Sequence, residues 1–125
     1  MITPIAEPPN VIREMNHDDV SMVSDIERRS YEFPWSHGVF RDCLLAGHQN
    51  IVLVRDQTVA GYGVLSIAAG EAHILNICVD PDYRSHGYGE KLLDELLFRA
   101  RAASVRTIFL EVRPSNERAI ALYRK

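Results

Sequence analysis

The stretch 78–90, which reads CVDPDYRSHGYGE, gives the clearest structural signal in the sequence. An apolar run ends at Val79, Pro81 stops it, and a polar loop containing Gly87 and Gly89 leads straight into an amphipathic run. This order predicts a strand, a tight loop and a helix. The apolar residues of that helix recur at helical spacing and are Leu92, Leu93, Leu96, Leu97 and Ala100.

The predicted loop is a candidate phosphate or pyrophosphate site. A strand that turns directly into a helix directs several backbone N–H groups, and the positive end of the helix dipole, into one small space. Gly87 and Gly89 would let an anion approach the backbone without a Cβ in the way, and Arg84 could add a charge-assisted contact. A plain turn with glycines chosen for sharpness explains the bare pattern equally well. The spacing fits neither a Walker loop nor the Rossmann fingerprint.

Before this loop, the sequence predicts an antiparallel meander. Three β-rich runs cover residues 51–55, 58–69 and 71–79. The first two are separated by Asp56-Gln57 and the last two by Gly70, which are typical turn residues. The meander places the phosphate loop at the end of its last strand.

Two helices and a short strand are predicted still earlier. Residues 11–15 alternate like a strand, and Asn16 can cap a helix that runs to about Ser30. Ser36 can cap a second helix, which Gly47 would end in the left-handed conformation. The first helix carries Val20, Val23, Ile26 and Glu27 at helical spacing, and its apolar members are expected to face inward.

After the central helix, the pattern predicts a strand at 107–112, a turn at 114–115 and the start of a helix at 119–125. The expected fold is therefore a mixed α/β (α+β) arrangement, with a mostly antiparallel twisted sheet and flanking helices. We expect a flexible arm at 1–10 and one domain at 11–125. Because the chain stops within an amphipathic helix, that domain is expected to be incomplete at its C-terminus.

Composition excludes several classes of protein. The chain has 125 residues, 25% of them charged, with a net charge of −3, which fits one globular domain rather than a basic nucleic-acid binder. Cys43 and Cys78 form no metal-ligand pattern, and two buried free thiols are favoured over a disulfide. No leader or long apolar run is present, so a cytoplasmic protein that binds neither membrane nor metal is expected.

With its flanks, the loop closely resembles the acetyl-CoA motif of the GCN5-related N-acetyltransferases, the GNAT family. The resemblance rests on Asn76-Ile77-Cys78-Val79-Asp80-Pro81 followed by Arg84-x-x-Gly87-x-Gly89. It implies that the loop holds the pyrophosphate of acetyl-CoA, while the preceding strand lends backbone groups to the pantetheine arm. The cofactor-binding residues so implied are Ile77, Cys78, Val79, Arg84, Ser85, His86, Gly87, Tyr88, Gly89, Glu90 and Asn116.

Two further segments narrow the resemblance to the bacterial ribosomal-protein-alanine N-acetyltransferases, the RimI group. They are Phe33-Pro34-Trp35-Ser36 and the run at 110–123, which reads LEVRPSNERAIALY. The resemblance implies acetylation of the N-terminal alanine of a small-subunit ribosomal protein, number eighteen, with Phe33, Trp35 and Asn76 on the acceptor side. An aromatic plug between two helices explains Phe33 and Trp35 equally well. The fold of that group continues past the tyrosine with two further strands, and the domain at 11–125 is expected to be without them.

The resemblance also assigns the proton transfers. An N-terminal amine has a pKa of about 7.7–8.0, so a nearby carboxylate must take its proton at neutral pH. Glu111 is the candidate base and Tyr123 the candidate acid, although the pattern alone would favour a solvated carboxylate and a packing aromatic. Glu71 is the rival base, while His73 and His86 receive no role and His86 is expected to face solvent.

The sequence is also compatible with two alternative functions. One is an acetyltransferase of the same fold that acts on a lysine or a small amine. The other is a non-catalytic acyl-CoA-binding module. The sequence leaves the oligomeric state undetermined.

Overall fold

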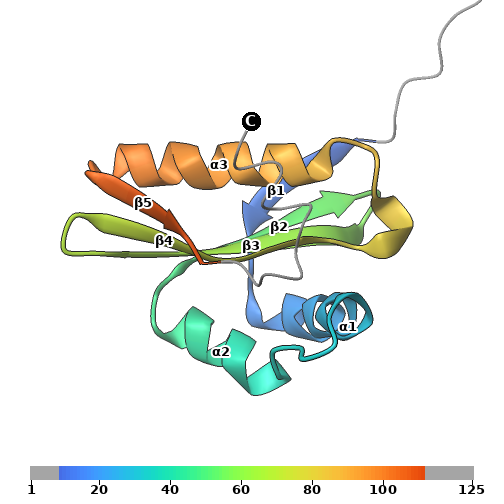
Figure 1. Ribbon diagram of the computed structural model, residues 1–125. Coiled ribbons are helices and arrows are strands. Elements are labelled where there is room, and N and C mark those ends of the chain that lie inside the picture. The colour runs from blue at the N-terminus through green and yellow to red at the C-terminus, as the bar shows by residue number, and fades with distance from the viewer. Residues whose placement is uncertain (1–8, 112–125) are drawn as a thin grey trace, which may run out of the picture.

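A computed structural model describes residues 9–111 as a five-stranded sheet with helices on both faces (Figure 1). The mixed α/β fold expected from the sequence is confirmed. The strands are β1 (Asn10–Glu14), β2 (Gln49–Arg55), β3 (Thr58–Ala68), β4 (Glu71–Val79) and β5 (Thr107–Leu110). The helices are α1 (Val20–Ser30), α2 (His37–Leu45) and α3 (Tyr88–Ala102), with short 3-10 turns at His17–Asp19 and Pro81–Tyr83.

The sheet has the order β1-β2-β3-β4-β5, and the first four strands pair antiparallel. Asp56 and Gln57 form the first turn of the predicted meander with φ of 49° and 68°, and Gly70 forms the second with φ of 79°. β5 pairs parallel to β4, because α3 carries the chain back across the sheet between them. The pairing sets Thr107 opposite Glu71 and Leu110 opposite Ile74.

Each face of the sheet has its own core. α3 covers one face with Leu92 and Leu96, whereas α1 and α2 cover the other with Ile26 and Phe40 (Figure 1). Gly63 in β3 permits close packing of α3, since a Cβ at this position would lie 2.9 Å from Leu96 Cδ1. The sheet therefore separates the hydrophobic core under α3 from the hydrophobic core under α1 and α2.

The predicted helix ends are also found. Asn16 caps the 3-10 turn that precedes α1, so α1 itself begins at Val20 rather than directly after the cap. Ser36 Oγ accepts from the Val39 N–H at 3.2 Å, and Gly47 has φ of 75° just after α2. These contacts satisfy helix-end groups that would otherwise lack a partner.

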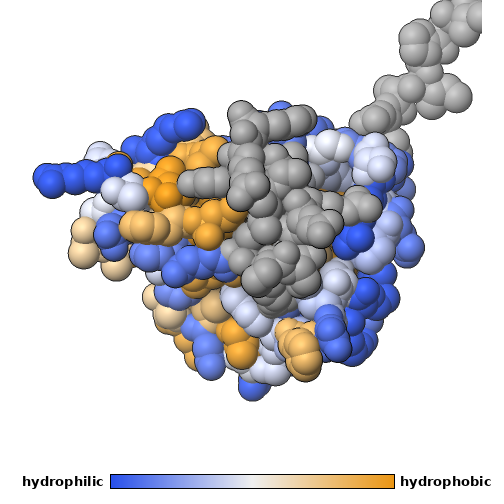
Figure 2. Space-filling view, viewed as in Figure 1, coloured by the Kyte–Doolittle hydropathy of each residue, from blue (hydrophilic) through white to orange (hydrophobic). Residues whose placement is uncertain are grey.

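β5 is one of the two edge strands of the described sheet, and hydrophobic surface gathers where it lies beside α3 (Figure 2). Phe109 on β5 is 42% exposed and Phe98 on α3 is 65% exposed. Both cysteines, Cys43 and Cys78, are buried and free. Within residues 9–111, no helix is long and apolar enough to cross a membrane.

Candidate active site

The loop between β4 and α3 has the geometry of an anion site. Ser85 and Gly87 adopt the left-handed conformation, with φ of 70° and 77°, and α3 begins at Tyr88. As a result, Gly89 lies in the first turn of the helix rather than in the loop. Within residues 9–111, the backbone N–H groups of residues 85–90 donate to no acceptor of the chain. A row of free N–H groups at a helix N-terminus is a binding surface for a phosphate.

The residues of this loop fit the pyrophosphate of an acyl-CoA. A Cβ placed on Gly87 meets no described atom within 4 Å, so the space beside this residue of the loop is open. Arg84 Nε donates to Val79 O at 3.3 Å, which uses one edge of the guanidinium and leaves its terminal nitrogens for an anion. His86 is exposed, as expected, but its Nδ1 lies 2.9 Å from Arg84 O. Because a carbonyl oxygen only accepts, Nδ1 carries the proton and donates to Arg84 O. This bond stabilises the conformation of the loop.

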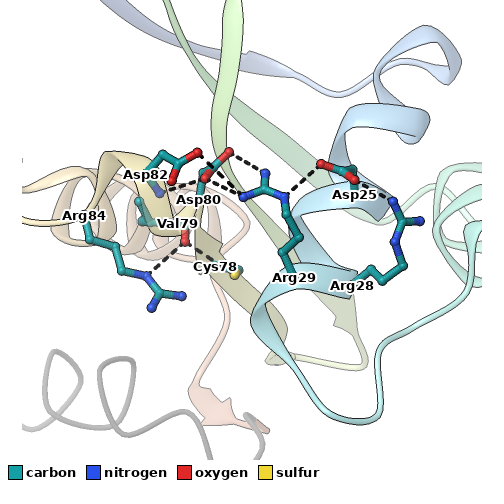
Figure 3. A network of polar contacts seen from close by, with 8 residues as sticks. All are labelled: Asp25, Arg28, Arg29, Cys78, Val79, Asp80, Asp82 and Arg84. Atoms are coloured by element: carbon teal, nitrogen blue, oxygen red, sulfur yellow. Dashed lines mark hydrogen bonds and ion pairs between the residues drawn. The ribbon is translucent and has the colours of Figure 1, made fainter.

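An ion-pair network ties the start of this loop to α1 (Figure 3). Arg29 donates to both carboxylate oxygens of Asp80, at 3.1 and 2.8 Å, and its Nε donates to Asp25 at 2.9 Å. Asp80 in turn accepts from the Asp82 N–H at 2.9 Å. The hydrogen bond from Arg29 is the main cause that lowers the pKa of Asp80, and the same bond raises the pKa of Arg29. This network was not predictable from the sequence pattern, because Arg29 and Asp80 lie 51 residues apart.

The lowered pKa of Asp80 predicts a pH-dependent loss of stability. A carboxylate whose pKa is lower in the folded state stabilises the protein above its unfolded pKa of about 4, and this contribution disappears as pH falls through the folded pKa. Asp80→Asn should lower the free energy of unfolding by about 2 kcal/mol at pH 7. The difference from the parent should shrink below about pH 4, as measured by urea unfolding across pH.

Asp82→Asn is the matched control for this prediction. Asp82 Oδ2 lies 3.9 Å from the same guanidinium, but its side chain is 82% exposed. An exposed pair of this kind contributes little, so Asp82→Asn should leave stability almost unchanged at every pH. Equal losses in the two variants would contradict the assignment to Asp80.

The candidate base Glu111 lies on the sheet face opposite α3. Its N–H donates to Ile74 O at 2.9 Å, which continues the β4–β5 pairing just past the end of β5. Ile108 and Leu110 pack into the core under α3, so the alternating direction of side chains puts Phe109 and Glu111 on the other face. The Glu111 side chain is 51% exposed and therefore open to solvent and to an acceptor.

His73 joins the two candidate bases, although sequence analysis gave it no role. His73 Nδ1 lies 3.0 Å from Glu111 Oε2, and its Nε2 lies 3.6 Å from Glu71 Oε1. The contact with Glu111 is within ion-pair range but lacks hydrogen-bond geometry, since Nδ1 has no hydrogen-bond partner among the described residues. Phe109 stacks on the imidazole with the ring centroids 4.9 Å apart. The register of β4 against β5 brings Phe109 and Glu111 to His73, whereas Glu71 lies two residues before His73 on the same strand.

The acceptor-side candidates occupy the same face of the sheet. Trp35 is half-buried with its ring 5.3 Å from Phe40, whereas Phe33 is 80% exposed. The two aromatic residues therefore differ: Trp35 packs between the helices, and Phe33 projects from the loop. Asn76 in β4 is 3% exposed, and its Nδ2 donates to Glu27 Oε1 at 2.9 Å.

Some predicted residues lie outside the described part of the chain. These are Asn116, Tyr123 and the turn and helix expected at 114–125. Within residues 9–111, no group of three His, Cys, Asp or Glu side chains could hold a metal ion. Ile77, Cys78 and Val79 form the end of β4 directly before the loop, and Glu90 is exposed on the first turn of α3.

Comparison with known proteins identifies the family. The family model for the acetyltransferase (GNAT) family matches residues 20–125. A [ribosomal protein bS18]-alanine N-acetyltransferase of Escherichia coli K12 is 36% identical over 114 residues, covering 91% of this chain and 77% of that protein.

Solved structures agree with this match. The ribosomal-protein-S18-alanine N-acetyltransferase from Escherichia coli superposes with a TM-score of 0.84 at 35% identity, covering 93% of this chain and 75% of that one. Ard1 from Thermoplasma volcanium also gives a TM-score of 0.84, at 29% identity, covering 92% of this chain and 79% of that one. The chain therefore belongs to the GNAT family and is an acetyl-CoA-dependent N-acetyltransferase.

Proposed function

We propose that the chain acetylates the N-terminal α-amino group of a protein, and that its acceptor is the N-terminal alanine of ribosomal protein bS18. The main support is the similarity to bS18-alanine N-acetyltransferases at 36% identity over most of both chains. The placement of Glu111 on the same face as Asn76 and the Trp35 loop is consistent with this acceptor.

The chain's own residues divide into a cofactor side and an acceptor side. We assign the N–H groups of residues 85–90 and the Arg84 guanidinium to the pyrophosphate, and residues 77–79 to the pantetheine arm. Asn116 is assigned to the cofactor from the family motif alone. Acetyl-CoA supplies an activated acetyl group as a thioester, so the protein must position an amine and move two protons.

Glu111 is proposed to take the proton of the acceptor amine, directly or through one water. Its carboxylate is half-exposed, which leaves room for an ammonium or a water beside it. Tyr123 is proposed to return a proton to the leaving thiolate, because a phenol with a pKa of about 10 remains protonated at pH 7. Direct attack by the amine needs no covalent enzyme intermediate.

An acetylation assay with defined peptides tests the acceptor. Peptides that match the bS18 N-terminus and carry an internal lysine should gain acetyl at the α-amino group of alanine, located by fragmentation mass spectrometry. Because a lysine pKa is about 10.4 against about 8 for the α-amine, roughly 300-fold less lysine amine is neutral at pH 7. The same peptide with a blocked N-terminus should therefore remain unmodified.

Peptides beginning with Ser or Met serve as controls for the side chain of the first residue. A pocket that fits alanine should discriminate against the larger methionine by about 10-fold or more in kcat/KM. Acetylation of lysine in the blocked peptide would contradict the proposal and would indicate a lysine acetyltransferase. Acetyl-CoA binding with no transfer to any amine would indicate a non-catalytic acyl-CoA-binding module.

A further inference from the structure

Glu27 is a fully buried charged residue on the side of the sheet that holds the acceptor candidates. It lies on α1 with 0% exposure, although the helical pattern predicted that only the apolar neighbours would face inward. A carboxylate is almost never buried in this way without several hydrogen-bond donors, because burial removes its hydration. The hydrogen-bond partners of Glu27 therefore indicate its role.

Among residues 9–111, three hydrogen-bond donors converge on this carboxylate. Oε1 accepts from the Tyr62 hydroxyl at 2.6 Å and from Asn76 Nδ2 at 2.9 Å. Oε2 accepts from the backbone N–H of Trp35 at 2.8 Å. Burial is the main cause that raises the pKa of Tyr62, so the phenol keeps its proton and remains a donor.

The three donors come from separate elements of the fold. Trp35 belongs to the loop between α1 and α2, Asn76 belongs to β4, and Tyr62 lies in β3 beneath both helices. The bond to Glu27 fixes the orientation of the Asn76 amide, with Nδ2 toward α1 and Oδ1 directed away from the Glu27 carboxylate. The bond to Trp35 fixes the backbone of the loop beside it.

α1 also contacts the proposed cofactor-binding loop, through a residue other than Glu27. Arg29, two positions after Glu27, binds Asp80 at the start of the phosphate loop. The contacts of Glu27 reach Trp35 and Asn76 instead. The two functions of α1 can therefore be separated by substitution.

We infer that Glu27 is a positioning residue for the acceptor: it holds the Trp35 loop and the Asn76 amide in the arrangement that receives the incoming N-terminus. This inference rests on the proposed function for the identity of the acceptor. It predicts that changing Glu27 weakens acceptor binding while acetyl-CoA binding persists.

Glu27→Gln is the test variant and Tyr62→Phe is its matched control. The glutamine side chain keeps the shape, but its NH₂ group must face at least one donor, so the contact with Trp35 or with Asn76 is lost. Tyr62→Phe removes one donor and keeps the bonds from Trp35 and Asn76 to the carboxylate. Both variants disturb a buried hydrogen bond, so a purely structural role would make them behave alike.

Steady-state kinetics distinguish an effect on acceptor binding from an effect on cofactor binding, because the KM values for peptide and for acetyl-CoA are measured separately. In Glu27→Gln, the peptide KM should rise about 10-fold or more, because hydrogen bonds to a charged group are lost in the positioning of the site. The KM for acetyl-CoA should not change, and Tyr62→Phe should retain the parent peptide KM. An equal rise of the peptide KM in both variants, or no rise in Glu27→Gln, would overturn the inference.

A spectroscopic readout is independent of the acceptor's identity. Trp35 is the single tryptophan of the chain, so its fluorescence reports on the loop alone. Glu27→Gln should shift the emission to longer wavelength and increase quenching by acrylamide, while Tyr62→Phe should match the parent. Unchanged Trp35 emission in a folded Glu27→Gln protein would overturn the inference.

A measurement on the unmodified protein covers the case in which Glu27→Gln does not fold. The Trp35 N–H, bound to a buried carboxylate, should exchange with deuterium more slowly than the Phe33 N–H of the same loop. Equal exchange of the two amides would overturn the inference. Failure of every peptide to be acetylated would instead refute the proposed acceptor, and the fluorescence and exchange results would still decide whether Glu27 holds the loop.

Discussion

Glu111→Gln is expected to lower kcat by about 100- to 10,000-fold at pH 7, because it removes the proposed proton acceptor while keeping the shape of the side chain. Part of the loss should be recovered as pH rises through the pKa of the acceptor amine, about 8, since the amine then loses its proton without help. Steady-state rates with an N-terminal peptide between pH 6 and 9.5 would measure both effects. CoA affinity should be unchanged, because Glu111 is not assigned to the pyrophosphate.

Glu71→Gln is the matched control for this experiment. Both carboxylates contact His73, at 3.0 Å for Glu111 and 3.6 Å for Glu71, and their side chains are 51% and 50% exposed. The two substitutions thus remove the same charge from the same neighbourhood. If Glu111 is the base, Glu71→Gln should retain most of the parent rate.

Other outcomes of this comparison would change which residue is assigned as the general base. A near-normal rate for Glu111→Gln at pH 7, with a large loss for Glu71→Gln, would make Glu71 the base. Equal small losses in both would favour proton transfer through water or His73.

Gly87→Val should weaken CoA binding about 100-fold or more. The side chain would stand in the open space before the N–H groups of residues 85–90, where the pyrophosphate is proposed to lie. Loss of two hydrogen bonds to a phosphate, each about 1.5 kcal/mol or more, accounts for an effect of this size. Isothermal titration calorimetry with CoA would measure it.

Backbone strain must be separated from obstruction, because Gly87 has φ of 77° and valine tolerates this conformation poorly. Gly70→Val is the control: Gly70 has φ of 79° and open space around it, but it lies in the turn between β3 and β4. Both variants should lose similar stability, and only Gly87→Val should lose CoA affinity. Unchanged affinity in a folded Gly87→Val protein would refute the loop assignment.

The sequence alone predicted the parts of this protein that depend on neighbouring residues. The caps at Ser36 and Gly47, the turn at Asp56-Gln57 and the loop before α3 are local, because each needs only a few consecutive residues with suitable side chains and backbone freedom. Strand and helix periods are also local, so the order of elements and the bounds of β4 were predictable. The candidate phosphate loop belongs to this group, since it consists of one strand end, two glycines and one helix start.

Only the tertiary structure decided which distant side chains meet. Glu27 lies at helical spacing with the apolar residues of α1, but the donors that satisfy its buried carboxylate, Tyr62 and Asn76, lie 35 and 49 residues away. The contact of His73 with Glu111 depends on the parallel register of β4 and β5, which α3 and the packing beneath it determine. A buried carboxylate is stable only where the fold supplies hydrogen-bond donors, and the spacing of residues along one helix does not reveal which remote residues provide them.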